Sequence, residues 1–198
     1  MNPQDFWNQR YSETDYAYGK QPNEFLADQL PRLPKGRILF PAEGEGRNAV
    51  YAAKLGWQSV AFDQSTAGQE KALRLAAKND VTIEYSVCNA LSFTQSNPFD
   101  AIAFCYFHTP PQHLNPIYSH LLKQLKPGGT VLLEGFSEKN LGLGSGGPQD
   151  LAMLFSTEKI AHLFQGLKNL RLWEEQVVLN EGKYHQGNAW VIRAIAEK

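Results

Sequence analysis

The sequence has little cysteine, no long apolar run and no excess of charge of either sign. Its two cysteines, Cys88 and Cys105, both lie in apolar, strand-like runs. That placement is typical of buried, reduced thiols in a cytosolic protein. No Cys/His cluster has the spacing of zinc ligands, so no metal site is expected. No run approaches the roughly 18 apolar residues that cross a bilayer, and we expect no membrane partner.

The charge balance also limits the partners. Lys and Arg total 19 against 20 Asp and Glu, which gives a formal net charge of -1. This balance makes nucleic acid an unlikely partner, because no bulk positive charge is available to bind it. The first residues, "MNPQDFWNQRY", lack the basic-then-apolar order of a signal peptide, so a cytoplasmic location is expected. A length of 198 residues suits a single domain over 1–198.

Apolar strand-like runs alternate with helical patterns along most of the chain. Such alternation requires crossover connections and therefore a parallel sheet, covered by helices on both faces. The predicted strands are 37–41, 59–63, 81–87, 99–107 and 130–136, and the predicted helices are 22–31, 47–55, 66–78 and 112–125.

The order changes after residue 137. A glycine-rich loop over 137–149 precedes one helix near 157–165, and two strand-like runs follow at 170–179 and 188–196. The connection "NEGKYHQG" between those runs is too short for a crossover, so it predicts an antiparallel hairpin at the end of the sheet.

The loop after the first predicted strand, "PAEGEGRNA", raises the main functional question. Glycines between a strand and a helix often let the backbone approach a phosphate at the helix N-terminus. Here Glu43 and Glu45 stand beside Gly44 and Gly46, and their charge disfavours a pyrophosphate. The same charge suits a cationic ligand such as a sulfonium. The stretch also fits G-x-G-x-x-G/A, a weak match that keeps a NAD(P)-linked oxidoreductase as an alternative.

Two further residues point to an adenosine ligand. Asp63 ends the second predicted strand, where a carboxylate accepts hydrogen bonds from the two ribose hydroxyls. Alternatively, Asp63 supplies a negative charge at the N-terminus of the next helix. Asn89 follows the third strand, where it serves either as a turn residue or as an amide for the adenine edge, beside the backbone of Ala90 and Leu91. Ser65 is the expected N-cap of the helix over 66–78.

These stretches resemble class I S-adenosylmethionine-dependent methyltransferases. The resemblance runs from about Phe6 to the C-terminus and rests on "EGEGRNA", "AFDQS", "LKPGG" and "EGKYHQGNAWVIRA". Within the class, "YGKQPNEFL" and that ending look like the tellurite-resistance branch, with thiopurine methyltransferases as relatives. The resemblance implies a three-layer α/β Rossmann-like fold, in which a seven-stranded, mostly parallel sheet ends in an antiparallel strand.

It also implies S-adenosyl-L-methionine as cofactor, lying across Gly44 and Gly46 with its ribose on Asp63. Three positions depart from the family: Phe40 replaces an acidic residue, Ala42 a glycine and Asn89 an aspartate. Either Glu43 or Glu45 replaces the lost acidic support of the methionine end, or Arg47 reaches the carboxylate of the cofactor. The expected cofactor-binding residues are Trp7, Tyr11, Ala42, Gly44, Gly46, Asn48, Asp63, Gln64, Ser65, Asn89, Ala90, Leu91 and Tyr106.

Methyl transfer needs alignment and exclusion of water more than it needs a strong base. Two histidines are the expected catalytic candidates. His108 lies at the end of the fourth strand and is alternatively a loop histidine before a Pro–Pro turn. His185 lies in the terminal connection and is alternatively an exposed turn histidine. Glu134 ends the fifth strand and is either a residue of the site or a surface or capping residue. The aromatic N-terminal residues 1–21 are read as a lid, with packing against the sheet as the alternative, and 137–149 as a flexible wall.

The leading hypothesis is a one-domain methyltransferase that uses S-adenosylmethionine on a small-molecule methyl acceptor. A thiol or a chalcogen compound is the expected acceptor, on the resemblance alone. A binding domain without turnover and a NAD(P)-linked oxidoreductase are the alternatives. The oligomeric state, the exact acceptor and the use of a general base stay open.

Overall fold

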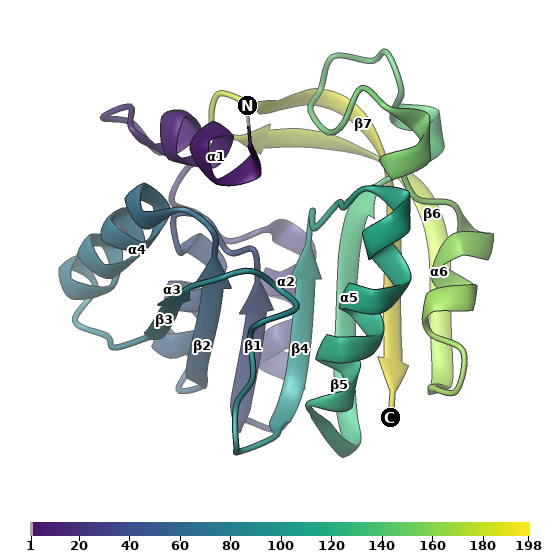
Figure 1. Cartoon of the computed structure of the whole chain (residues 1–198), viewed down its shortest axis with the longest axis horizontal. Coiled ribbons are helices and arrows are strands. Elements are labelled where there is room, and N and C mark those ends of the chain that lie inside the picture. The colour runs from purple at the N-terminus through teal and green to yellow at the C-terminus, as the bar shows by residue number, and fades with distance from the viewer. Residues whose placement is uncertain (1) are drawn as a thin grey trace.

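A seven-stranded sheet forms the centre of the computed structural model, which describes residues 2–198 (Figure 1). The strand order is β3-β2-β1-β4-β5-β7-β6. Neighbouring strands from β3 to β5 pair in parallel, and β7 runs antiparallel to both β5 and β6. This confirms the predicted fold class. The strands are β1 (Arg37–Pro41), β2 (Gln58–Asp63), β3 (Glu84–Val87), β4 (Phe99–Cys105), β5 (Leu125–Phe136), β6 (Lys168–Glu181) and β7 (His185–Glu197).

Helices cover both faces of the sheet, as strands this apolar require. Successive residues of β1 point to opposite faces: Ile38 and Phe40 pack with α2, α3 and α4, whereas Leu39 packs with α5 and α6. The helices are α1 (Pro3–Tyr11), α2 (Glu24–Gln29), α3 (Arg47–Lys54), α4 (Thr66–Lys78), α5 (Pro111–Lys123) and α6 (Thr157–Leu163), with short 3-10 turns η1 (Leu30–Arg32), η2 (Glu138–Asn140) and η3 (Leu151–Met153).

Some predicted boundaries were wrong. The strand expected over 81–87 keeps only its second half, because β3 is an edge strand that pairs with β2 alone. The leading helix expected over 22–31 is the short α2 followed by η1. The terminal connection is shorter than expected, since Glu181 still belongs to β6 and His185 begins β7. None of the helices in residues 2–198 combines the length and apolar character that crossing a membrane requires.

The sheet order places a switch point between β1 and β4. The chain moves outward from β1 through β2 to β3, then returns to β4 on the other side of β1. In open parallel sheets, ligands bind at the carboxyl ends of the strands near such a point. Helix α1 lies over these strand ends (Figure 1), so the N-terminal segment is in position to cover a ligand there.

A buried ion pair holds that segment down. Lys71 of α4 contacts Glu45 Oε1 at 2.7 Å, and both side chains are at most 5% exposed. Lys71 Nζ also donates to the carbonyl of Asp15 (2.6 Å), while Glu45 Oε2 accepts from the amide of Ala17 (2.7 Å). The pair therefore ties the loop after α1 to both α4 and the glycine loop.

We expect Lys71→Met to lower the free energy of unfolding by roughly 3–5 kcal/mol, because it leaves the Glu45 carboxylate buried without its cation. Urea denaturation measures this change. The double variant E45Q/K71M should recover much of the loss. Lys139→Met, which removes an exposed ion pair with Glu174, should change stability by less than about 1 kcal/mol. A K71M protein as stable as the K139M protein would contradict this account of the segment.

Candidate active site

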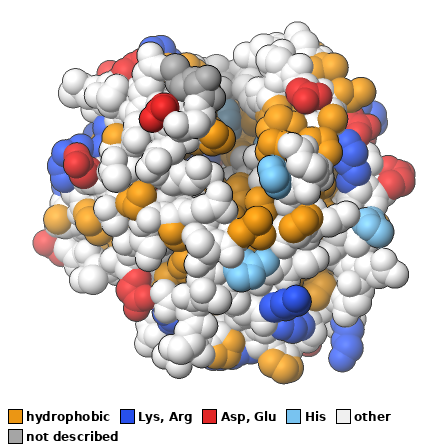
Figure 2. All heavy atoms as spheres, in the orientation of Figure 1, with side chains coloured by type: hydrophobic (Ala, Val, Ile, Leu, Met, Phe, Trp, Pro, Cys, Tyr) orange, Lys and Arg blue, Asp and Glu red, His pale blue; other side chains and the backbone are white. Residues whose placement is uncertain are grey.

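A cavity of about 680 Å³ lies at the carboxyl ends of β1 to β4, within the size range of small-molecule sites. The space-filling view shows a hollow near the centre of the molecule, where apolar side chains gather (Figure 2). Ten of the thirteen predicted cofactor residues line this cavity, whereas Gly44, Gly46 and Ser65 do not. The ten are Trp7, Tyr11, Ala42, Asn48, Asp63, Gln64, Asn89, Ala90, Leu91 and Tyr106.

The glycines of the loop make room for neighbouring elements. Both have positive φ, +61° at Gly44 and +87° at Gly46. A Cβ at Gly44 would lie 2.5 Å from the hydroxyl of Tyr11, and one at Gly46 would lie 2.5 Å from the Cβ of Ala72. Gly44 thus admits the lid and Gly46 admits α4. Ala42 also has positive φ (+51°), a conformation that an L residue adopts at some cost and that glycine adopts freely.

Glu43 occupies the N-terminus of α3. Its Oε1 accepts hydrogen bonds from the amides of Asn48 (2.7 Å) and Ala49 (2.8 Å). These amides are among the free N–H groups that would otherwise bind an anion. Burial raises the pKa of Glu43 to about 7, although these hydrogen bonds and Arg47 oppose the shift. A phosphate at this helix end would have to displace a side chain that is already bound there.

The expectation that both loop glutamates face a cationic ligand was wrong for Glu45. Its charge is matched by Lys71, and it does not line the cavity. Phe40 is fully buried between the sheet and its helices, so it offers no polar support to a ligand. Of the two glutamates, only Glu43 borders the cavity.

Asp63 lies at the end of β2 with its carboxylate in the cavity wall. One oxygen accepts from the amide of Gly44 (3.1 Å) and the other from the amide of Ser65 (2.9 Å). Burial raises its pKa to about 6, against the lowering effect of these bonds. Each carboxylate oxygen keeps a further lone pair, so Asp63 can still accept from two hydroxyls. Ser65 caps α4 through a bond from the amide of Gly68, as predicted.

The segment after β3 forms another part of the wall. Asn89 Oδ1 accepts from the amide of Leu91 at 2.9 Å, so its side chain stabilises the local turn. This supports the turn-residue reading of Asn89. The amide nitrogen of the side chain has no partner among residues 2–198 and remains available to a ligand in the cavity.

The N-terminal helix forms the roof. Trp7 stacks on Tyr11 with ring centroids 5.5 Å apart, and both rings line the cavity. Asn8 Oδ1 accepts from the hydroxyl of Ser65 (2.7 Å), which docks α1 on the N-terminus of α4. Arg10 lies 3.7 Å from the ring centroid of Tyr184 at the β6–β7 turn. The roof therefore contacts both the cofactor side and the hairpin side of the cavity.

His108 is held by the backbone at both ring nitrogens. Its Nδ1 contacts the carbonyl of Met153 at 2.8 Å, and its Nε2 accepts from the amide of Phe136 at 3.0 Å. Burial lowers its pKa to about 4. His108 lines the cavity, but these contacts leave neither nitrogen free to take a proton.

The loop over 137–149 packs behind His185 through Gly146 and contributes no lining residue.

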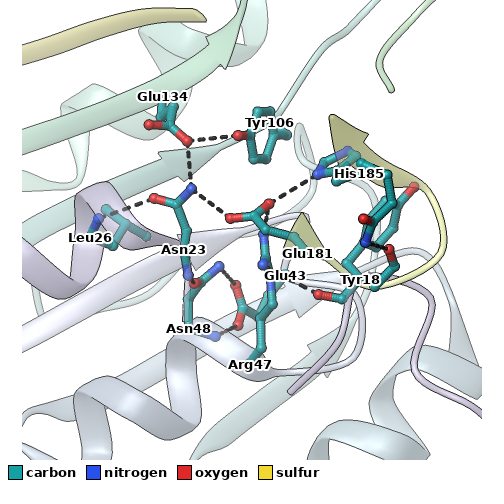
Figure 3. Close-up of polar contacts among 12 residues, drawn as sticks. Tyr18, Asn23, Leu26, Glu43, Arg47, Asn48, Tyr106, Glu134, Glu181 and His185 are labelled. Carbon is teal, nitrogen blue, oxygen red and sulfur yellow. Dashed lines mark hydrogen bonds and ion pairs between the residues drawn. The ribbon is translucent and has the colours of Figure 1, made fainter. Parts of the chain in front are cut away.

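His185 belongs to a buried polar network (Figure 3). Its Nδ1 contacts Glu181 Oε2 at 3.1 Å, and Arg47 donates to the same oxygen at 3.0 Å. Asn23 donates to Glu181 Oε1 (3.1 Å) and to Glu134 (2.5 Å), and Tyr106 also donates to Glu134 (2.7 Å). The structure thus shows His185 as a buried residue of the cavity wall, and the reading of an exposed turn histidine was wrong.

Sequence reasoning missed Asn23 and Glu181. Asn23 lies one residue before α2, and its visible signal is only that of an N-cap. Glu181 lies four residues before His185. On a helix this spacing places two side chains on the same face, but across a tight turn between two strands it predicts no contact. Among residues 2–198 there is no group of three or more His, Cys, Asp and Glu side chains placed to hold a metal ion.

Residues 38–129 match the family model of a methyltransferase domain. No curated protein matches the sequence. TehB from Haemophilus influenzae has a TM-score of 0.74 at 14% identity, over 98% of this chain and 66% of TehB.

Two other solved structures are similar over nearly the whole length. One comes from work on the conversion of a disulfide bond into a thioacetal group during echinomycin biosynthesis, with a TM-score of 0.76 at 16% identity over 99% of this chain and 92% of that one. The N-methyltransferase NodS from Bradyrhizobium japonicum WM9, in complex with S-adenosyl-L-homocysteine, has a TM-score of 0.73 at 12% identity over 100% and 99%. These likenesses establish the fold, and the domain match indicates a methyltransferase domain over residues 38–129.

Proposed function

We propose that this protein transfers a methyl group from S-adenosylmethionine to a small molecule with a soft nucleophile, a thiol or a chalcogen compound. The observation that carries the proposal is the presence of both Glu43 and Asp63 in the wall of the cavity. Glu43 fills the anion site at the N-terminus of α3, while Asp63 stays open to ribose hydroxyls. A site of this kind suits an adenosine ligand without phosphate, and it argues against a NAD(P)-linked oxidoreductase.

The residues present fit this cofactor. S-adenosylmethionine supplies an electrophilic methyl group on a positively charged sulfur. Asp63 would accept hydrogen bonds from the ribose, and the segment 89–91 would border the adenine. The aromatic roof of Trp7 and Tyr11 would exclude water and place ring faces near the positive charge. Resemblance to the tellurite-resistance branch is the reason for naming a chalcogen acceptor.

On the acceptor side, the wall is apolar. Phe107, Pro110, Ile117 and Met153 line it. Three histidines also line the cavity: His113 is exposed, His108 has both ring nitrogens bonded to the backbone, and His185 is buried with no partner for Nε2 among residues 2–198. We propose His185, rather than His108, as the group that takes the proton of a thiol acceptor. A thiol is mostly protonated at neutral pH, so a base contributes there.

Asp63→Ala should weaken binding of S-adenosylhomocysteine by roughly 10- to 100-fold, the size expected for lost hydrogen bonds to a charged group. Isothermal titration calorimetry measures this affinity. Asp100→Asn is the matched control: it removes a carboxylate that bonds Arg37 and Lys126 outside the cavity lining, and it should leave the affinity unchanged. Equal affinities of D63A and wild type would refute the ribose assignment.

The pKa of about 6 for Asp63 predicts a pH dependence. Below that pH the carboxyl is protonated and accepts hydrogen bonds poorly, so affinity for S-adenosylhomocysteine should fall as the pH drops. The decrease should reach roughly tenfold between about pH 7.5 and pH 5. In Asp63→Asn the component centred near pH 6 should disappear. If D63N shows the same pH profile as wild type, another group is responsible.

The acceptor class can be tested with radiolabelled S-adenosylmethionine and a panel of benzenethiol, 2-mercaptoethanol, selenite and tellurite. We expect transfer to at least one of them, and His185→Asn should lower kcat for 2-mercaptoethanol, which is mostly protonated at neutral pH, by roughly 100-fold while binding of S-adenosylhomocysteine is kept. Cofactor binding with no transfer to any member would instead favour a binding domain without turnover.

A further inference from the structure

Glu181 is a buried carboxylate at this site with three side-chain partners. Its Oε1 accepts from Asn23, and its Oε2 accepts from Arg47 and meets Nδ1 of His185 (Figure 3). Its side chain is 8% exposed. These partners come from the start of α2, the N-terminus of α3 and the first residue of β7, so one carboxylate joins three elements at the cavity.

The ionisation of Glu181 decides which nitrogen of His185 carries the proton. Burial alone would raise the pKa of Glu181, but the hydrogen bond from His185 and the charge of Arg47 outweigh it and hold the pKa at about 2. Glu181 is therefore a carboxylate at neutral pH, and a carboxylate only accepts hydrogen bonds. The contact with Nδ1 then requires a proton on Nδ1. In a neutral imidazole this leaves Nε2 as the lone-pair nitrogen.

We propose that Glu181 is the positioning residue of this site: it holds His185 in the Nδ1–H tautomer, with Nε2 ready to accept a proton from the methyl acceptor. Arg47, at the start of α3, links this arrangement to the cofactor loop through the same oxygen of Glu181. The proposal rests on the role of His185 given under Proposed function.

The positioning has a clear use in the reaction with a thiol. His185 Nε2 takes the proton of the S–H group, and the acceptor sulfur forms the new bond to the methyl carbon. The old bond from that carbon to the sulfonium sulfur breaks, and its electron pair stays on the departing sulfur. One positive charge thus leaves the cofactor and one appears on His185, beside the carboxylate of Glu181.

The other groups that face His185 do not supply such a carboxylate. Tyr18 and Tyr106 pack on its ring with centroids 4.5 and 4.4 Å away. Burial lowers the pKa of His185 and the cations Arg47 and Arg10 lower it further, whereas Glu181 raises it. His108 is held neutral by burial. Removal of the Glu181 charge should therefore make His185 much harder to protonate.

Nuclear magnetic resonance of protein with ¹⁵N-labelled histidine tests this without any acceptor. Long-range proton–nitrogen spectra report the tautomer of each ring, and the signals missing in His185→Asn identify His185. We expect the Nδ1–H tautomer in wild type. In Glu181→Gln we expect the proton affinity of His185 to fall about tenfold or more, as for loss of a neighbouring opposite charge. A wild-type Nε2–H tautomer would overturn the proposal, whether or not the variant folds.

Two controls separate positioning from general loosening of the structure. Glu175→Gln removes another carboxylate of β6, one that bonds Arg193 and does not contact His185, and it should leave the His185 signals unchanged. His108 is an internal control, because its backbone contacts should keep its tautomer in every folded variant. An unchanged proton affinity in folded E181Q would overturn the proposal.

The positioning role of Glu181 and the proposed function can fail separately. If His185 has the expected tautomer but His185→Asn transfers methyl groups as fast as wild type, His185 is no base while Glu181 still orients it. If His185→Asn loses transfer but the tautomer is Nε2–H, the function stands and the positioning role fails.

Discussion

The carboxylate of Glu43 at the N-terminus of α3 is the contact on which the rest of the site depends. It binds the amides of Asn48 and Ala49 where an anionic ligand would otherwise bind. Asn48 in turn accepts a hydrogen bond from the amide of Asn23 at 2.9 Å. Asn23 contacts both Glu134 and Glu181. A continuous path of buried hydrogen bonds thus runs from the cofactor loop to the terminal hairpin.

The burial of two acidic side chains at the cavity, Asp63 and Glu43, has a cost in stability. Burial raises the pKa values of Asp63 and Glu43 to about 6 and 7, above the values of their unfolded states. For each group, between its unfolded and its folded pKa, the folded protein binds more protons than the unfolded chain. The free energy of unfolding therefore decreases as the pH rises through that range. At neutral pH the free protein therefore holds Asp63 largely ionised and Glu43 partly ionised, in buried positions where a carboxylate is less stable than in water. Such groups cluster at functional sites, where a ligand offsets their cost.

The apolar patterns were enough to predict most of the architecture. Runs such as 37–41 and 59–63, and helical spacing over 66–78, predicted their elements because burial on a sheet or helix face imposes those periods. The position of Asp63 at the cavity followed from topology, because the carboxyl ends of parallel strands lie at the same edge of the sheet. The mostly polar α1 has no strong apolar face, and its helix is stabilised by contacts with α4 and the hairpin that only the folded chain provides.

The roles of charged side chains could not be predicted in the same way. Glu43 and Glu45 are two residues apart and look alike in the sequence, yet one caps α3 at the cavity and the other pairs with Lys71 away from it. The difference depends on where α3 and α4 lie relative to the loop. Likewise, Glu181 meets Arg47 only because the hairpin folds back over the start of α3.

The proposed ligand of the cavity is an adenosine compound with no phosphate at the start of α3. The sharpest check is calorimetric titration of the wild-type protein with S-adenosylhomocysteine, NAD and ADP in one buffer at about pH 8, where Glu43, with a pKa of about 7, is mostly ionised. We expect S-adenosylhomocysteine to bind, and NAD and ADP to bind at least about tenfold more weakly, because their phosphates meet the carboxylate of Glu43. Binding of NAD or ADP as tight as that of S-adenosylhomocysteine would contradict this proposal.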